Sequence, residues 1–268
     1  MQLSVCTGPR EEGHFMTVAL ALGRRAFGNA WPNPAVGAVL IRNENGVPIV
    51  VGRGWTQPGG RPHAETEALR RAGGAARGAT LYVTLEPCSH HGKTPPCADA
   101  IIAAGVIRVV SALEDPNPEV AGRGHARLRA QGVRVDVGLG AEEAARAHAG
   151  HITRVRFGRP HLTLKLAISA DNKVALAGRI PTAISGPAAR DFVHLMRAQN
   201  DAIMVGIGTV MSDDPLLTCR LPGMERRSPV RVVLDPRLRL PLTSALARTA
   251  EAVRTWVIAG PDAPRAAE

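Results

Sequence analysis

The strongest constraint on the fold comes from four residues that the chain has to bring to one point. A histidine and a glutamate stand two positions apart at His63 and Glu65, and two cysteines follow at Cys88 and Cys97. One imidazole and two thiolates fill three positions of a catalytic zinc site, and the fourth position stays open for water. A fold in which these residues act together must bring three separate segments of the chain to one place.

Glu65 is the candidate for proton transfer in such a site. Zinc lowers the pKa of its water to roughly 7, and attack on an amino-bearing ring carbon needs a proton carried to the leaving ammonia. Residues i and i+2 do not share a helix face. His63 and Glu65 therefore meet the metal only where a loop turns into a helix, and Pro62 is typical of that entrance. Cys88 follows a predicted strand, which indicates a helix N-terminus that would favour its thiolate.

Other interpretations of these residues stay open. Taken singly, they are an ordinary helix-start histidine, a solvated carboxylate and two buried cysteines. A structural zinc site would use four ligands, with His90 or His91 as the fourth. A non-catalytic, zinc-stabilised binding module of this kind would not need Glu65.

The apolar pattern of the first half predicts an α/β domain. The expected helices cover 15–29, 63–72, 98–104 and 124–131, and the expected strands begin near 35 and cover 48–55, 81–85, 106–113 and 133–137. A helix, two adjacent strands joined by a turn, and then alternating helices and strands are typical of a three-layer α/β/α arrangement.

A second α/β pattern follows a helix predicted over 141–151 and a connector over 154–160. We expect strands at 161–169, 201–210, 229–234 and 256–259, and a helix at 186–199. The expected division is a domain at 1–149, a linker at 150–160 and a second domain at 161–268. The last strand stands near the end of the sequence, so we expect an unfinished sheet.

Composition narrows the classes of partner. The net charge is +10. This charge is either a consequence of an arginine-rich composition or a feature that attracts anionic ligands. Aromatic residues make up only 3%, which disfavours base stacking, so we expect no nucleic-acid partner. No apolar run approaches the roughly 20 residues that span a bilayer, and the first residues lack a signal core. We therefore expect a cytoplasmic protein without a membrane partner.

Two motifs resemble one enzyme family. PHAETEAL, from residue 62, and EPCSHHGKTPPC, from residue 86, are similar to the deaminase half of the bifunctional deaminase/reductase of riboflavin biosynthesis. The long segment between the two cysteines separates that family from nucleic-acid base deaminases, the rival interpretation. NPAVGAVLI, from residue 33, resembles the family's pyrimidine-contacting strand.

The resemblance implies a cytidine-deaminase-like fold and the hydrolytic deamination of 2,5-diamino-6-(5-phosphoribosylamino)pyrimidin-4-one to the uracil form. Carried over by position, the site consists of the zinc ligands His63, Cys88 and Cys97, the proton shuttle Glu65, and the substrate contacts Asn33 and Lys93. Thr56 stands where the family commonly has a histidine, so the sequence departs from the family at one substrate contact.

The second half is similar to the start of the family's reductase, over TLKLAISADNKVA from residue 163 and ISGPAARDFVHLMRAQNDAIMVGIGTVMSDDPLLTCR from residue 184. That reductase has a dihydrofolate-reductase-like fold and uses NADPH to convert the ribosyl group to a ribityl chain. The implied contacts are Ala167, Thr209 and Asp213 for NADPH, and Arg197, Leu217 and Arg220 for substrate.

From the residues alone, this second site is less defined. Gly206 and Gly208 indicate either a backbone that comes close to a ligand or a simple bulge. Arg197 and Arg220 are suited either to binding a phosphate group or to an exposed position on the surface. The sequence departs from the family at Asn172, Pro181 and Ala183. Members of the family continue beyond the matched region, so we expect a partial reductase domain with impaired reductase activity. We also expect that any homo-oligomer forms through this domain. Cys6 and Cys219 carry no functional signal.

Overall fold

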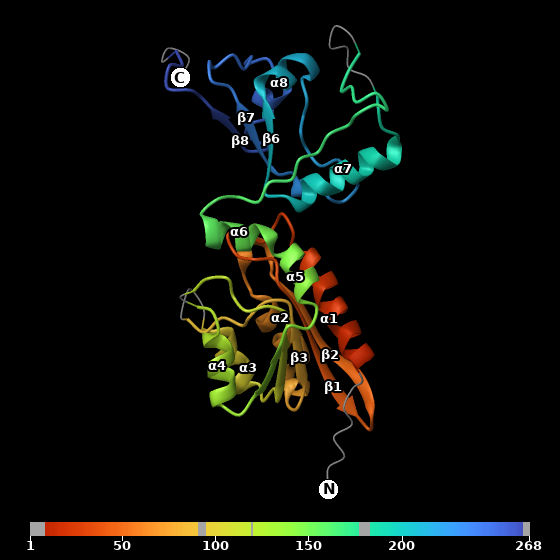
Figure 1. The fold of residues 1–268 in the computed structure, drawn as a ribbon, viewed down its shortest axis with the longest axis vertical. Coiled ribbons are helices and arrows are strands. Elements are labelled where there is room, and N and C mark those ends of the chain that lie inside the picture. Colours follow the sequence, from red (N-terminus) through yellow and green to blue (C-terminus); the bar gives the residue numbers. More distant parts are fainter. Residues whose placement is uncertain (1–8, 91–94, 119, 177–182, 265–268) are drawn as a thin grey trace. The chain divides into compact units, whose positions relative to one another are not determined.

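The computed structural model describes residues 9–90, 95–118, 120–176 and 183–264, and it gives the side chains from residue 11 onward. The chain divides into two compact units, Met1–Leu162 and Thr163–Glu268. Each unit contains its own β-sheet (Figure 1).

The first unit is built on a five-stranded sheet of order β2-β1-β3-β4-β5. Its strands are β1 (Gly37–Glu44), β2 (Val47–Trp55), β3 (Thr80–Val83), β4 (Arg108–Ser111) and β5 (Arg134–Val137). Strand β1 runs antiparallel to β2 and β3, whereas β3, β4 and β5 are parallel. Asn45 and Gly46 link β1 to β2 with φ angles of 55° and 89°, which are typical of a hairpin turn.

Helices cover both faces of this sheet. They are α1 (Pro9–Arg24), α2 (Ala64–Ala72), α3 (Cys97–Ala103), α4 (Arg123–Ala130), α5 (Ala141–Ala147) and α6 (Ala149–Phe157), with short 3₁₀ turns η1 (Pro58–Gly60) and η2 (Gly73–Ala76). Figure 1 shows α1 and α5 on one side of the sheet and α3 and α4 on the other. Ala38 and Leu40 face the core formed with α2, α3 and α4, and Val39 and Ile41 face the core formed with α1 and α5. This confirms the predicted three-layer α/β/α arrangement.

Two glycines allow helices to lie directly on the sheet. A Cβ atom at Gly54 would stand 2.1 Å from the carbonyl oxygen of Ala64, in the first turn of α2. A Cβ atom at Gly37 would stand 1.9 Å from the carbonyl oxygen of Ala19, in α1. Any larger residue would displace these helices, so the two glycines fix how deeply α1 and α2 sit.

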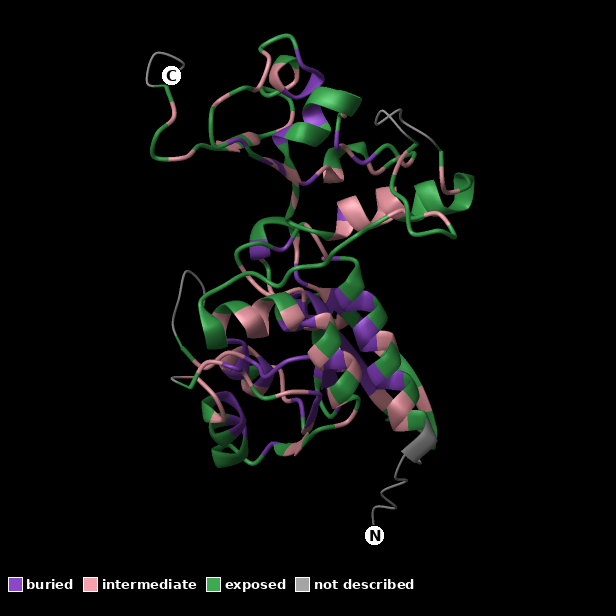
Figure 2. Cartoon of the chain, turned by 45° about the horizontal axis from the view of Figure 1, so that its top comes forward, coloured by how far each residue is buried: buried purple, intermediate pink, exposed green. Residues whose placement is uncertain are grey.

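The second unit contains a parallel three-stranded sheet of order β6-β7-β8. Its elements are α7 (Pro187–Gln199), β6 (Ala202–Gly206), α8 (Ile207–Asp213), η4 (Glu225–Arg227), β7 (Val230–Leu234), α9 (Ala245–Arg248) and β8 (Thr255–Ile258). Its small core includes Ile207, Val210, Leu217, Val233 and Leu246. Figure 2 shows that buried residues are more sparse here than in the first unit.

Three local predictions are wrong. Residues 161–169 form no strand, because no neighbouring strand pairs with them, and Leu162, Leu164 and Leu166 are exposed. The predicted strand over 201–210 ends at Gly206, where α8 begins. The predicted connector over 154–160 is helical as far as Phe157, and His148 separates α5 from α6 within the single helix that was expected.

In the second unit, α7 confirms the helix predicted at 186–199 to within one residue. No helix in the described part of the chain is long and apolar enough to cross a membrane.

Candidate active site

Three segments of the first unit meet at one cluster of possible metal ligands. His63 is the N-cap residue of α2, Cys88 lies in the loop after β3, and Cys97 is the first residue of α3. Their ligand atoms all lie within 4.8 Å of one another. The Nδ1 atom of His63 is 3.7 Å from the Cys88 Sγ and 3.3 Å from the Cys97 Sγ.

These distances fit a tetrahedral zinc ion. Zinc bonds of about 2.0–2.3 Å to nitrogen and sulfur place two ligand atoms about 3.6 Å apart. The observed separations of 3.3 and 3.7 Å lie on either side of that value. One nitrogen and two sulfur donors suit zinc, and three protein ligands leave one coordination position for water or substrate.

The two thiols differ in their affinity for protons. Cys88 accepts a hydrogen bond from the backbone N–H of Cys97, with a donor–acceptor distance of 3.3 Å. Hydrogen bonding from the Cys97 side chain is the main cause that lowers the pKa of the Cys88 thiol to about 4, and the same contact raises the pKa of Cys97. The prediction that Cys88 begins a helix is wrong, because Cys97 occupies that place and the loop of Cys88 folds back against it.

Glu65 lies in the first turn of α2, two residues after His63, and is only 4% exposed. Burial raises the pKa of its carboxyl to about 7, with a smaller opposing contribution from His63. A carboxyl group with this pKa exchanges protons readily near neutral pH. Hydrogen bonding to Cys88 raises the pKa of His63 as well, so the cluster holds several exchangeable protons before any metal is bound.

Asn33 reaches the same cluster from the loop before β1. Its Nδ2 atom lies 3.3 Å from His63 Nε2 and donates to the carbonyl oxygen of Gly60 at 2.8 Å. The structure therefore brings this predicted substrate contact next to a predicted ligand. Lys93, the other predicted contact, lies outside the described residues.

Thr56 forms hydrogen bonds to the backbone of the loop before β1. The residue is 2% exposed. Its hydroxyl accepts a hydrogen bond from the backbone N–H of Val36 at 3.0 Å and donates to the carbonyl oxygen of Pro34 at 2.9 Å. Thr56 thus ties the loop that carries Asn33 to the end of β2, and its hydroxyl both donates to and accepts from the backbone.

In the second unit, one predicted substrate contact reaches the segment that carries the other two, Leu217 and Arg220. The Arg197 guanidinium donates to the Thr218 carbonyl oxygen at 2.9 Å. Burial and, to a smaller extent, the charge of Arg220 lower the pKa of Arg197. Leu217 lies next in the chain but is 5% exposed and belongs to the core. The pair of arginines is suited to an anionic ligand.

The predicted NADPH contacts are spread along the second unit. Thr209 and Asp213 are exposed on α8, and Ala167 is half-buried in the irregular segment 161–169. None of the described contacts joins Ala167 to α8. Of the departures from the family, Pro181 lies outside the described residues, and Asn172 has a φ angle of 60°. Asparagine tolerates this left-handed conformation better than most residues, which accounts for its place at a position where the family has glycine.

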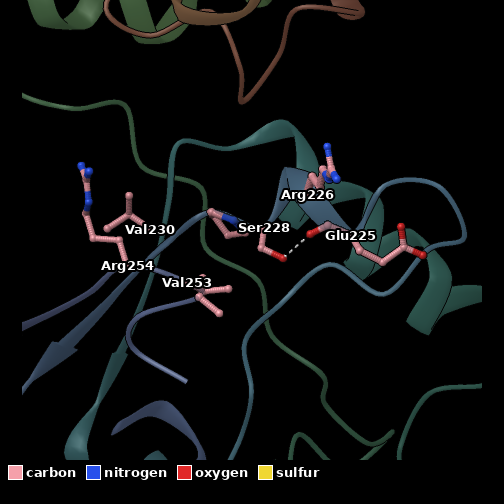
Figure 3. Close-up of a pocket in the computed structure, with 8 residues that line it drawn as sticks. Glu225, Arg226, Ser228, Val230, Val253 and Arg254 are labelled. Carbon is pink, nitrogen blue, oxygen red and sulfur yellow. Dashed lines mark hydrogen bonds between the residues drawn. The ribbon is translucent and has the colours of Figure 1, made fainter. Parts of the chain in front are cut away.

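A small hollow in the second unit is lined by none of the predicted site residues. It has a volume of about 150 Å³ and is lined by η4, the start of β7 and the residues before β8, including Ser228 and Arg254 (Figure 3). Ligands of parallel sheets bind at the carboxyl ends of the strands, whereas this hollow lies at the amino ends. The hollow therefore does not identify a ligand site.

The sequence reasoning missed one buried residue beside the cluster, Glu86. Its carboxylate stands two residues before Cys88 and accepts four backbone hydrogen bonds. An acidic residue at the end of an apolar strand, directly before Pro87 and Cys88, was the available signal.

Comparisons with known proteins cover both units. Residues 9–113 match the family model for the cytidine and deoxycytidylate deaminase zinc-binding region, and residues 160–267 match the model for the RibD C-terminal domain. The chain is 44% identical to riboflavin biosynthesis protein RibD of Escherichia coli (strain K12), with 92% of this chain and 71% of the relative covered. It is 44% identical to RibD of Aquifex aeolicus (strain VF5), with 89% and 66% covered.

The chain is also similar to solved structures of RibD proteins. Acinetobacter baumannii RibD, form 1, has a TM-score of 0.83 at 39% identity, with 93% of this chain and 70% of that chain covered. A diaminohydroxyphosphoribosylaminopyrimidine deaminase/5-amino-6-(5-phosphoribosylamino)uracil reductase from Thermotoga maritima has a TM-score of 0.85 at 39% identity, with 95% and 71% covered. The chain thus spans about two thirds of the length of these relatives.

Proposed function

The chain belongs to the RibD family of riboflavin biosynthesis proteins, and from that premise we propose that its first unit is a zinc-dependent pyrimidine deaminase. The proposed substrate is 2,5-diamino-6-(5-phosphoribosylamino)pyrimidin-4-one, and the products are the uracil form and ammonia. The observation that carries the proposal is the convergence of His63, Cys88 and Cys97 within 4.8 Å, with the buried Glu65 two residues from the histidine.

His63, Cys88 and Cys97 would hold the metal ion. When bound, zinc supplies Lewis acidity that lowers the pKa of a water in its open position. Metal binding requires both cysteines as thiolates. Cys88 is already poised for this, because its thiol has a pKa of about 4.

Glu65 would carry the proton during hydrolysis. Its carboxylate accepts the proton from the attacking water and then donates it to the departing amino group, which leaves as ammonia. A pKa of about 7 suits both directions of transfer. Asn33, held by Gly60 beside His63, would orient the pyrimidine ring at the same place.

We propose for the second unit a part in NADPH-dependent reduction of the ribosyl group. Arg197 and Arg220 would bind the anionic substrate, and Ala167, Thr209 and Asp213 would contact NADPH. Because this sequence spans about two thirds of its relatives, reductase activity of these 268 residues is expected to be impaired.

A structural zinc site is the alternative. It would use a fourth protein ligand. Among the described residues, the cluster contains one histidine and two cysteines, and His90 is exposed outside it. His91, the other candidate for a fourth ligand, lies outside the described residues. The buried Glu65 also favours the catalytic proposal, because a purely structural site has no use for a carboxyl group with a raised pKa.

One assay tests both halves of the proposal. The zinc-loaded protein is mixed with the proposed substrate and NADPH, and ammonia release and NADPH oxidation are followed in the same cuvette. We expect ammonia with little loss of NADPH. Equal amounts of ammonia release and NADPH oxidation would contradict the expectation for the second unit, and no ammonia from zinc-loaded protein would contradict the proposal for the first.

A further inference from the structure

Glu86 is buried beside the metal-ligand cluster without a nearby cationic partner among the described residues. The residue is 5% exposed, and its closest basic group is the Nδ1 atom of His125, 3.9 Å away. Burial lowers the pKa of His125, so this imidazole is neutral near pH 7. The carboxylate must therefore be stabilised by something other than an ion pair.

Backbone amides supply that stabilisation. The Oε2 atom accepts hydrogen bonds from Asp115 N at 3.0 Å and Gly122 N at 2.9 Å. The Oε1 atom accepts from Gly124 N at 2.8 Å and His125 N at 3.2 Å. Hydrogen bonds to an ionised group are shorter and stronger than neutral ones. Glu86 therefore joins the two ends of segment 115–122 and holds the first turn of α4.

The neighbouring backbone is packed against the same turn. A Cβ atom at Gly124 would stand only 2.0 Å from the carbonyl oxygen of Pro87, so α4 touches the peptide that leads into Cys88. On its other side, the Cys88 carbonyl oxygen accepts a hydrogen bond from Ala98 N at 3.1 Å. Cys88 is thus held between α4, through Glu86 and Pro87, and the first turn of α3.

We infer that Glu86 is a positioning residue for the metal site, which fixes the place of the Cys88 sulfur by fastening the Glu86–Cys88 segment to the first turn of α4. This inference rests on the proposed zinc site. Glu86 acts through the backbone and does not touch the metal, the substrate or the reacting atoms.

A second set of possible metal ligands lies within 4.8 Å of one another and consists of Glu86, Glu114 and His125. The hydrogen bonds exclude that use in the folded protein, because each oxygen of Glu86 already accepts two N–H groups. A carboxylate offers about four lone-pair positions, and all four are occupied. We therefore expect one zinc ion per chain.

The direct test is Glu86→Gln. The glutamine is isosteric, but its NH₂ group faces two backbone N–H donors, so two of the four hydrogen bonds are lost and donors oppose each other. Loss of an outer-shell partner commonly weakens metal affinity or activity 10–100-fold. We expect zinc affinity, measured by chelator competition on the full chain, to fall by about this factor. In the Co²⁺-loaded protein, the thiolate-to-cobalt absorption band should shift.

Two further variants make the test specific. Gly124→Ala keeps the Glu86 side chain, but its Cβ atom would stand 2.0 Å from the Pro87 carbonyl oxygen and 3.0 Å from the Glu86 Oε1 atom. It displaces the same attachment of Glu86 and Pro87 to α4, so it should also weaken zinc binding, and it provides a second test where Glu86→Gln does not fold. Asp99→Asn removes the exposed ion pair between Asp99 and Arg127, which also ties α3 to α4. This control should keep wild-type zinc affinity and the wild-type cobalt spectrum.

The outcomes separate the two proposals. Folded Glu86→Gln and Gly124→Ala proteins with lower thermal stability but unchanged zinc affinity and cobalt spectrum would overturn the positioning role and leave the deaminase proposal intact. Loss of a second zinc equivalent in Glu86→Gln would make Glu86 a ligand and would also overturn it. A wild-type protein that binds no zinc would overturn the proposed function itself.

Discussion

Replacing Glu65 by glutamine should remove activity and, above neutral pH, increase stability. The folded protein raises the pKa of this carboxyl from 4.5 to about 7 because it is buried, so the folded state binds the Glu65 proton more tightly than the unfolded chain. The contribution of Glu65 to wild-type stability therefore falls as the pH rises from about 4.5 to about 7. The glutamine side chain does not ionise in this pH range, so the stability of the variant does not fall for this reason.

The magnitude follows from the shift. Each pKa unit corresponds to about 1.4 kcal/mol, and most of the shift lies between pH 5 and pH 8. The stability advantage of Glu65→Gln over wild type should thus grow by about 2.5 kcal/mol between these two pH values. The deaminase rate should meanwhile fall about 10²–10⁴-fold, the usual contribution of a general acid–base group.

Urea unfolding of the metal-free protein measures the stability difference, since a bound cation would add its own charge beside Glu65. The second unit must not contribute to the signal. Of the three tryptophans, only Trp256 lies in that unit, so both proteins carry Trp256→Phe and fluorescence then reports the first unit. A constant difference between the two proteins from pH 5 to pH 8 would refute a raised pKa for Glu65.

Three further substitutions test the geometry of the site. Cys88→Ser should abolish stoichiometric zinc binding, measured by metal analysis after gel filtration, because a hydroxyl does not replace a thiolate ligand. Gly54→Ala should lower kcat about 10–100-fold, because its Cβ would stand 2.1 Å from the Ala64 carbonyl oxygen and small misplacements are costly in catalysis; Gly74→Ala, which has open space around it, is the matched control. Thr56→Val should destabilise the first unit by about 1–3 kcal/mol in urea unfolding, because it removes two hydrogen bonds of the buried hydroxyl, to Val36 N and to the Pro34 carbonyl oxygen, each worth roughly 0.5–1.5 kcal/mol; unchanged stability would show that the loop does not need these hydrogen bonds.

The metal-ligand cluster was predictable because its chemistry limits the arrangement strongly. His63 and Glu65 had to stand at a helix start, and the structure places His63 at the N-cap of α2. The local position of Cys88 was not predictable, since it depends on how the loop after β3 folds back to receive the N–H of Cys97. The use of Glu86 depends on amides from residues 115 to 125, which no local pattern reveals.

The second unit shows where periodicity misleads. Residues 161–168 alternate in a strand-like way, yet a strand exists only where a neighbour pairs with it, and the described part of the chain offers none. The apolar run after Asp201 was too short to distinguish strand from helix, and the chain turns from β6 into α8 at Gly206. By contrast, α7 has an apolar stripe over several turns, and its limits were predicted closely.

The most direct test of the proposed deaminase is ammonia release from 2,5-diamino-6-(5-phosphoribosylamino)pyrimidin-4-one by one preparation in three states. The protein is assayed with zinc, after removal of zinc by a chelator, and after zinc is restored. We predict stoichiometric ammonia in the first and third states and none in the second, with Glu65→Gln inactive although it binds zinc. Ammonia release that survives chelation, or that Glu65→Gln retains in full, would contradict the account.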